Sequence, residues 1–420
     1  MEIKYLSAQN RQFIWTPCAL MGKDLQKHRN MLLEIRGGRI VSLQKISPAE
    51  LEANPTRFPN LYHLPEGSTL MPSLVDAHVH LALSANGQDN EKNIADIAPE
   101  ARDITTRFMK NGIGAVRDGG DRDNYNGRVR DIVAAENADD MEKTEKEEDA
   151  EDAAGLGQFR ILSPGWALRK NKKYGSFLGE GYSNREELAN KLATLVEGGM
   201  DHIKVIVSGI VSFKAYGKVG SLAMSTHDLK YVSHFAREQG LKVMAHANSP
   251  EAAEMAINAG VDSIEHGYFI TAEQLEKMGE KQIAWVPTII PVAVQLHHPQ
   301  RENWEKAERE VISRTYCEHI DKLKLALDKG VPLGIGTDSG ASGVIHGDFL
   351  LEEMELYRQG KLNNREILKA ATIVNARILG LAETRGSLEE GKSVSFIGVR
   401  GDPLQDLRVL RQINYFFLSC

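Results

Sequence analysis

The chain has 420 residues, 42% of them hydrophobic, and a net charge of −7. This length exceeds what one core usually serves, so we expect a main domain with a smaller companion. The mild negative charge argues against a nucleic-acid-binding surface, and no apolar run approaches the ~20 residues of a membrane span. The N-terminus lacks a secretory pattern. Three widely spaced cysteines, Cys18, Cys317 and Cys420, favour reduced thiols and a cytoplasmic protein.

The two ends of the chain carry short β-type runs. Within residues 1–65, Met31–Arg36 and Arg39–Leu43 flank a glycine pair, a pattern typical of a hairpin. Similar runs lie near the C-terminus, at Ser393–Val399 and Asn414–Leu418.

Between residues 70 and 380, short apolar segments alternate with helical patterns, and several helices end at glycine. Eight β-type segments in this arrangement predict an α/β fold of the (β/α)8 TIM-barrel type. The expected strands are Val75–His80, Ile113–Asp118, Phe159–Pro164, His202–Ser208, Lys242–His246, Ser263–Glu265, Ala284–Thr288 and Pro332–Thr337. The expected helices are Arg185–Glu197, His227–Glu238, Pro250–Ala259, Ala272–Gly279, Trp304–Lys329 and Arg365–Leu379.

Residues 136–154 form an acidic, low-complexity insertion with almost no large apolar side chains. A solvated loop and an exposed helix with Glu–Lys pairs both fit this composition. A functional acidic arm is a third alternative, although runs of charge are usually solvated faces.

The most informative motif is Asp76-Ala77-His78-Val79-His80, at the end of the first expected barrel strand. Residues i and i+2 of a strand point to the same side, so His78 and His80 can converge on one metal ion. Four further polar residues also end short apolar runs: Lys204, His246, His266 and Asp338. Barrel enzymes place their chemistry at the carboxyl ends of strands, which predicts that the six residues meet.

This ordered set resembles the amidohydrolase superfamily of metal-dependent hydrolases. The likeness is to the branch of two-metal dipeptidases and prolidases, with imidazolonepropionase-like enzymes nearby. It runs from about Leu70 to Gly391 and includes Pro72–His80, Ile264–Gly267, Val286–Thr288, Gly336–Asp338, Ala370–Ala376 and Gly386–Lys392.

The resemblance implies a barrel over residues 69–382 and a small β-sandwich built from residues 1–68 and 383–420. One departure concerns that sandwich. The family's Gly-Lys-Asp-Ala-Asp-Leu stretch reads Gly391-Lys392-Ser393-Val394-Ser395-Phe396 here. It lies outside the expected catalytic set.

The resemblance also implies two divalent metal ions, with zinc expected. Lys204 would be carboxylated, and its carbamate would bridge the two metals. A metal-bridging hydroxide would attack an amide carbonyl, and Asp338 would be the catalytic proton acceptor. One metal would be held by His78, His80, Lys204 and Asp338, and the other by Lys204, His246 and His266. A mononuclear site using the HxH pair, one later histidine and Asp338 is the alternative.

The substrate is less well defined. Tyr216 and His346 are candidate substrate contacts, whereas His202 is expected to be structural and His297-His298 to be a loop pair. Basic loop residues offer a site for a substrate carboxylate, or are simply solvated: Arg169, Lys170, Lys172, Lys173, Lys214 and Lys218.

The sequence thus favours hydrolysis of a small N-acyl amino acid or dipeptide-like amide. A cyclic-amide hydrolase or deaminase is the alternative among enzymes, and a catalytically inactive metal-binding barrel is the alternative outside them. The expected partner is a small-molecule substrate, with a possible homo-oligomer and with neither nucleic acid nor membrane.

Overall fold

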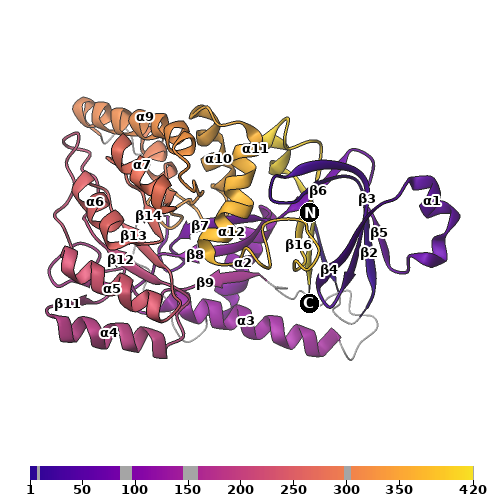
Figure 1. Ribbon diagram of the computed structural model, residues 1–420, viewed down its shortest axis with the longest axis horizontal. Helices are drawn as coiled ribbons and strands as arrows, with labels where there is room; N and C mark the ends of the chain where they lie inside the picture. The colour runs from indigo at the N-terminus through magenta and orange to yellow at the C-terminus, as the bar shows by residue number, and fades with distance from the viewer. Residues whose placement is uncertain (7–9, 86–96, 145–158, 298–303, 420) are drawn as a thin grey trace.

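The computed structural model describes residues 1–6, 10–85, 97–144, 159–297 and 304–419. It confirms an α/β fold. Parallel strands surrounded by helices occupy one side of the molecule, and a sheet that contains both chain ends occupies the other (Figure 1). Within the described ranges, no helix is both long enough and apolar enough to span a bilayer.

The terminal sheet has eight strands in the order β1-β17-β16-β6-β2-β3-β4, with β5 paired to β2. The predicted hairpin is confirmed, because β3 and β4 pair antiparallel around the glycine pair. The two C-terminal runs are confirmed as the antiparallel pair β16 and β17, and β17 also pairs in parallel with β1. The strands are β1 (Glu2–Leu6), β2 (Gln12–Met21), β3 (Gln26–Arg36), β4 (Arg39–Lys45), β5 (Leu61–His63), β6 (Ser68–Pro72), β16 (Ser395–Arg400) and β17 (Ile413–Ser419).

Seven short parallel strands form two further sheets of three and four strands. Each is almost entirely buried, which explains why these segments are apolar runs rather than alternating patterns. The chain that follows the last strand of the three-stranded sheet runs along the first strand of the four-stranded sheet: Leu168 N–H donates to the Lys204 carbonyl at 2.8 Å, and its carbonyl accepts from Ile206 at 2.9 Å. The strands are β7 (Leu74–Val79), β8 (Ile113–Asp118), β9 (Arg160–Leu162), β12 (Ile203–Ile206), β13 (Val243–His246), β14 (Ser263–Glu265) and β15 (Ala284–Val286).

The prediction of an eighth strand over Pro332–Thr337 is wrong, because this segment does not form a regular strand. The segment lies between β15 and β7, where Gly334 N–H donates to Trp285 and Ala77 N–H donates to Ile335. The tight fit explains its irregular backbone: a Cβ on Gly336 would lie 2.7 Å from the Cβ of His78. The segment therefore carries the chain past the HxH motif at very close range.

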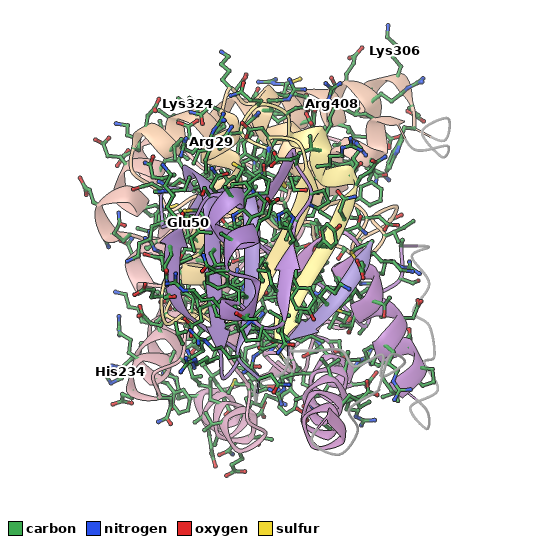
Figure 2. All side chains as sticks on the ribbon, turned by 90° about the vertical axis from the view of Figure 1, so that its right-hand side faces the viewer. Arg29, Glu50, His234, Lys306, Lys324 and Arg408 are labelled. Carbon is green, nitrogen blue, oxygen red and sulfur yellow. The ribbon has the colours of Figure 1, made fainter. Side chains whose placement is uncertain are left out.

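Helices cover the parallel strands on the outside (Figure 1). Their N-termini are well capped, as where the Asn184 and Ser249 side chains accept backbone N–H bonds from the first turns of α4 and α6. Charged side chains such as Lys306 and His234 project from the outer helices (Figure 2). The helices are α1 (Pro48–Ala53), α2 (Ala98–Lys110), α3 (Tyr125–Thr144), α4 (Arg185–Glu197), α5 (Thr226–Glu238), α6 (Pro250–Ala259), α7 (Ala272–Lys281), α8 (Ile290–His297), α9 (Lys306–Asp328), α10 (Leu350–Gln359), α11 (Asn364–Lys369) and α12 (Asn375–Leu379).

Two predicted features differ in detail. The single helix expected over Arg365–Leu379 is interrupted by a π-helical turn at Ala370–Val374. The acidic insertion 136–154 begins inside α3, where Glu136 accepts a hydrogen bond from Arg102 at 2.8 Å. Its remainder from residue 145 lies outside the described residues.

Candidate metal centre

Three of the predicted ligands converge at the carboxyl end of β7. His78 lies within the strand and His80 just after it, and both are buried. Asp338 follows the glycine-containing segment beside β7, so its Oδ1 lies 3.6 Å from His78 Nε2 and 3.4 Å from His80 Nε2. One ligand atom from each residue lies within 4.8 Å of the others. This spacing suits a shared cation.

The far nitrogens of these imidazoles are already bonded. His78 Nδ1 lies 2.9 Å from Glu265 Oε2, and His80 Nδ1 lies 3.2 Å from the Gly120 carbonyl. Carboxylates and carbonyls only accept, so each Nδ1 carries the proton. Each Nε2 is left as a hydrogen-bond acceptor on the side of the ring that faces Asp338. A metal-ligating histidine requires this arrangement.

His266 and His246 continue the cluster. The Thr288 hydroxyl donates to the Pro287 carbonyl, so its oxygen accepts from His266 Nδ1 at 2.6 Å. His246 Nε2 lies 3.0 Å from the Asn248 side-chain amide nitrogen and 3.3 Å from the Gly209 carbonyl. The His246 and His266 ring centroids are 4.5 Å apart.

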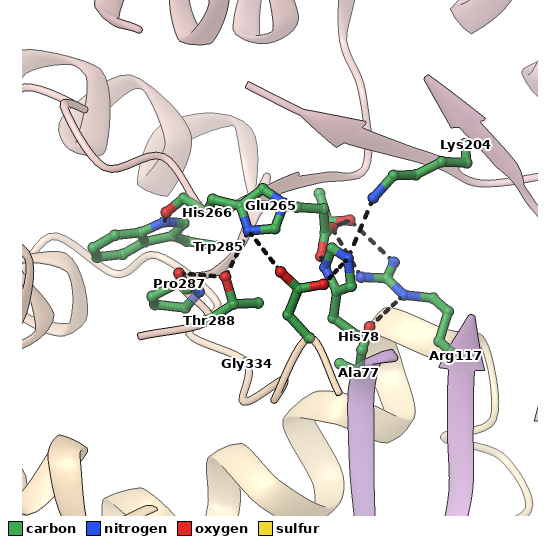
Figure 3. A network of polar contacts seen from close by, with 12 residues as sticks. Ala77, His78, Arg117, Lys204, Glu265, His266, Trp285, Pro287, Thr288 and Gly334 are labelled. Atoms are coloured by element: carbon green, nitrogen blue, oxygen red, sulfur yellow. Dashed lines mark hydrogen bonds and ion pairs between the residues drawn. The ribbon is translucent and has the colours of Figure 1, made fainter. Parts of the chain in front are cut away.

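Lys204 completes the predicted set from β12. Its side chain is 1% exposed, and its Nζ lies 3.4 Å from His78 Nε2. Figure 3 shows this amine directed at the His78 ring. The sequence prediction that all six residues gather in one place therefore agrees with their positions in the fold.

Sequence reasoning missed the buried ion pair beneath the cluster. Arg117 donates to Glu265 Oε1 at 2.9 Å, to the Ala77 carbonyl at 2.8 Å and to Ser263 Oγ at 3.0 Å (Figure 3). Glu265 thus faces Arg117 with one oxygen and His78 with the other. The sequence does contain a sign of this pair, because Arg117 and Glu265 are each a charged residue inside a short apolar run.

Three residues of the centre have left-handed backbones. The φ angles are +64° at His266, +48° at Thr288 and +52° at Asp338. Such conformations cost of order 1–3 kcal/mol for residues with a Cβ, and they cluster at functional sites. They turn these side chains out of the strand direction and toward the cluster.

Burial governs the electrostatics. It lowers the pKa of His80 and of His246 to about 3 and the pKa of His78 well below its usual range, so these imidazoles are neutral at pH 7. Burial also lowers the pKa of Lys204 to about 8 and raises that of Asp338 to about 7. Neutral imidazoles are the form that binds metals.

The donors fit a divalent metal. Neutral imidazole nitrogens and a carboxylate oxygen are ligands that zinc accepts. The outer bonds to Glu265 and Thr288 fix the rings in the orientation that ligation needs. The residues therefore fit the metal-dependent chemistry that the sequence predicts.

A cavity of about 490 Å³ opens above the cluster. Its size falls within the usual range for small-molecule sites. Its lining includes the predicted ligands His80, His246, His266 and Asp338. Most of its other lining residues are aromatic or aliphatic, including Tyr174, Phe177, Val211, Phe213, Tyr268 and Val292.

Neither predicted substrate contact is among the cavity-lining residues. Tyr216 donates its hydroxyl hydrogen to Glu318, and the Arg314 guanidinium lies 3.6 Å above its ring centroid. His346 Nε2 lies 2.9 Å from the His80 carbonyl, so His346 contacts the backbone of a predicted metal-ligating residue. The contacts with Glu318 and Arg314 hold Tyr216 outside the cavity lining. The spacing of residues along the chain does not predict this position.

The other histidines singled out from the sequence are placed as follows. His202 is buried, and its Nε2 lies 3.1 Å from the Asp118 carbonyl, which agrees with a structural role. The backbone of His297 ends α8. Its side chain and the whole of His298 lie outside the described residues.

Comparisons with known proteins place the chain in context. A family model described as the amidohydrolase family matches residues 69–418. An uncharacterized protein of Mycobacterium tuberculosis is 27% identical over 359 residues, covering 84% of this chain and 85% of the relative. Ochratoxinase of Aspergillus niger is 28% identical over 232 residues, covering 54% of this chain and 46% of the enzyme.

Solved structures support the same fold. A crystal structure described as a Xaa-Pro dipeptidase with bound methionine in the active site superposes with a TM-score of 0.76. It is 24% identical, and the superposition covers 96% of this chain and 97% of that structure.

Proposed function

The chain belongs to the amidohydrolase family of hydrolases that act on carbon–nitrogen bonds, and we propose that it hydrolyses the amide bond of a small N-acyl amino acid or dipeptide-like compound. One observation carries the proposal: ligand atoms of His78, His80 and Asp338 lie within 4.8 Å of one another, and His80 and Asp338 line the cavity. The likeness to a protein described as a Xaa-Pro dipeptidase makes a dipeptide-like amide our first choice of substrate.

We propose that two zinc ions occupy the centre. The first would be held by His78, His80 and Asp338, and the second by His246 and His266, with Lys204 between them. When bound, such ions polarise a carbonyl and lower the pKa of a coordinated water to about 7. The 4.5 Å separation of the His246 and His266 rings supports the second position.

Lys204 is proposed to be carboxylated. Its burial and its lowered pKa, about 8, make the neutral amine accessible near neutral pH. The amine nitrogen attacks the carbon of CO₂, an N–C bond forms, and one amine proton leaves to solvent. The product is a carbamate with one negative charge, a bidentate oxygen ligand in place of an ammonium that cannot ligate a metal.

Asp338 would move the proton. It is held against the two imidazoles of the HxH motif, and it also lines the cavity. A carboxylate that lines the cavity beside the ligand cluster is placed to accept a proton and to return it. We propose that it accepts the proton of the attacking water and delivers it to the leaving amine.

The parallel strands are proposed to form a (β/α)8 barrel. Supporting contacts lie at both edges of the four-stranded sheet: Leu168, which follows β9 in the chain, bonds to β12, and Gly334 bonds to β15. The isolated bridge between Val79 and Ser339 supports closure on the remaining side.

Hydrolysis of an amide panel tests the function. The purified protein is incubated with dipeptides, N-acyl amino acids and lactams, and the released amine is quantified. We expect cleavage of linear amides by the wild type, and none by a His78→Ala/His80→Ala variant whose folded state is verified by circular dichroism. Cleavage of lactams alone would overturn the substrate class, and no cleavage of any amide would overturn the function.

The carbamate has its own test. ¹³C-labelled bicarbonate should give a carbamate resonance in the wild type that is missing from Lys204→Ala. A Lys204→Ala variant that holds two metals as tightly as the wild type would remove the carbamate from the account.

A further inference from the structure

The cavity is more aromatic than amide hydrolysis alone requires. Tyr174 and Phe177 come from the loop after β10 (Arg169–Lys170), Phe213 from the loop after β12, and Tyr268 from the segment after β14. The rings are packed, not loose: Tyr174 and Phe177 meet edge to face at 5.8 Å, and Phe213 meets Trp304 at 5.6 Å. Three separate segments thus present fixed aromatic surface to one space.

Two of the loop cations, Arg169 and Lys170, are bonded to other groups. The Arg169 side chain donates to the backbone carbonyls of Gly179, Lys170 and Lys173. Lys170 Nζ lies 3.3 Å from Asp228. Among the described residues that line the cavity, none is a lysine or an arginine. The loop cations that the sequence offered for a substrate carboxylate are therefore not part of the described lining.

The polar groups of the lining beyond the ligand cluster are neutral. Asn248 is 2% exposed, and its Oδ1 has no hydrogen-bond partner among the described residues. Gln295 adds a second amide from α8. Such groups bind an uncharged donor or acceptor, but they do not balance a charge.

Building on the proposed amide hydrolysis, we propose that this cavity selects uncharged amides that carry an aromatic group over otherwise identical amides with a free carboxylate. Aromatic walls favour a ring through burial and through edge-to-face contact. A carboxylate taken from water into the same space would lose part of its hydration without gaining a lysine or arginine partner from the described lining residues. The preferred substrates would be dipeptide-like amides whose carboxylate is absent or blocked.

A pair of probes that differ only in the carboxylate tests this inference. N-benzoylphenylalanine and N-(2-phenylethyl)benzamide each contain one amide bond and the same two rings. We expect kcat/KM to be at least about 10-fold higher for the neutral probe, since 1.4 kcal/mol of uncompensated charge already gives that factor. A third probe, N-acetylmethylamine, lacks both rings and should be cleaved least efficiently.

Substitution of Gln295 should reverse the preference. Gln295→Arg places a cation in the lining and should shift the ratio of the two kcat/KM values toward the acid by about 10-fold or more. Gln295→Met, the matched uncharged change, should keep the wild-type preference. Lys214→Gln removes a loop cation outside the described lining and should also leave the ratio unchanged.

The outcomes separate the two claims. Faster cleavage of the neutral probe supports the inference. Faster cleavage of the acid overturns it, as does a loss of acid cleavage in Lys214→Gln. If linear dipeptides are cleaved while both two-ring probes are inert, the inference fails and the proposed function survives. If no amide of any kind is cleaved, the proposed function itself fails.

Discussion

Glu265 Oε2 accepts a hydrogen bond from His78 Nδ1 at 2.9 Å, while the other oxygen of the same carboxylate is bonded to Arg117. All three side chains are buried. The carboxylate therefore sets the tautomer of His78 from behind, and the bond to Arg117 holds the carboxylate in its orientation. This relationship leads to the first prediction.

Glu265→Gln should weaken metal binding by about 10- to 100-fold, the typical effect of losing a partner behind a metal-ligating histidine. The change also leaves Arg117 without its buried counter-charge, so it should destabilise the fold by about 3–5 kcal/mol. Competition with a chromogenic chelator measures the first effect and chemical denaturation the second. Glu254→Gln is the matched control, because Glu254 is half-exposed beside Lys277. Unchanged affinity in Glu265→Gln would remove it from the centre.

Asp338→Asn separates metal binding from proton transfer. Asparagine keeps one oxygen in place but is a poor proton acceptor. We expect kcat to fall by about 10²–10⁴-fold, the typical value of general acid–base catalysis, while much of the metal is retained. Metal content and turnover must be measured on the same sample. Near-normal turnover at full occupancy would contradict the role of Asp338.

Thr288→Val tests the support behind His266. The buried hydroxyl accepts from His266 Nδ1 and donates to Pro287. Valine is similar in shape but leaves His266 Nδ1 without this partner, at a cost of about 1–3 kcal/mol, whereas the Pro287 carbonyl still lies 3.0 Å from His319 Nε2. We expect lower thermal stability and weaker binding of the second metal. Thr288→Ser retains the hydroxyl and should rescue metal binding. If Ser and Val behave alike, the hydrogen bond does not matter.

A buried carboxyl away from the metal ligands makes stability depend on pH. Burial raises the pKa of Glu353 from its usual 4.5 to about 8, even though it accepts backbone N–H bonds from Ile289 and Ile290. The folded state therefore holds this proton more tightly than the unfolded state. The resulting stabilisation is full below about pH 4.5 and is lost as the pH rises through about 8.

Glu353→Gln should flatten that dependence. In metal-free protein, the unfolding free energy of the wild type relative to the variant should be greatest at pH 5 and should decline toward pH 8. Glutamine has no proton to lose, so its own cost is the same at each pH. Denaturant titrations at pH 5, 6, 7 and 8 measure the difference. Parallel pH profiles for the two proteins would show that Glu353 is ionised in the folded state.

The ligand set could be predicted from the sequence because each ligand follows an apolar strand and parallel strands end at one edge. His78, Lys204 and His266 meet for this reason. The walls of the cavity could not be predicted, because Phe177 and Phe213 lie in loops without periodicity. Arg117 was missed because β8 and β14 lie in different sheets, and only the fold, not spacing along the chain, brings Arg117 to Glu265. The eighth strand was wrong because Gly336 packs against His78 too closely for a regular ladder.

The account rests on the claim that metal bound at His78, His80 and Asp338 is what makes the protein cleave amides. Metal is removed with a chelator, the chelator is dialysed away, and zinc is added back in steps while bound zinc and dipeptide hydrolysis are measured in the same tube. We predict that hydrolysis is absent without metal and rises with occupancy to a plateau at two ions per chain. Full hydrolysis by the metal-free protein, or occupancy of both sites without hydrolysis of any amide, would contradict the account.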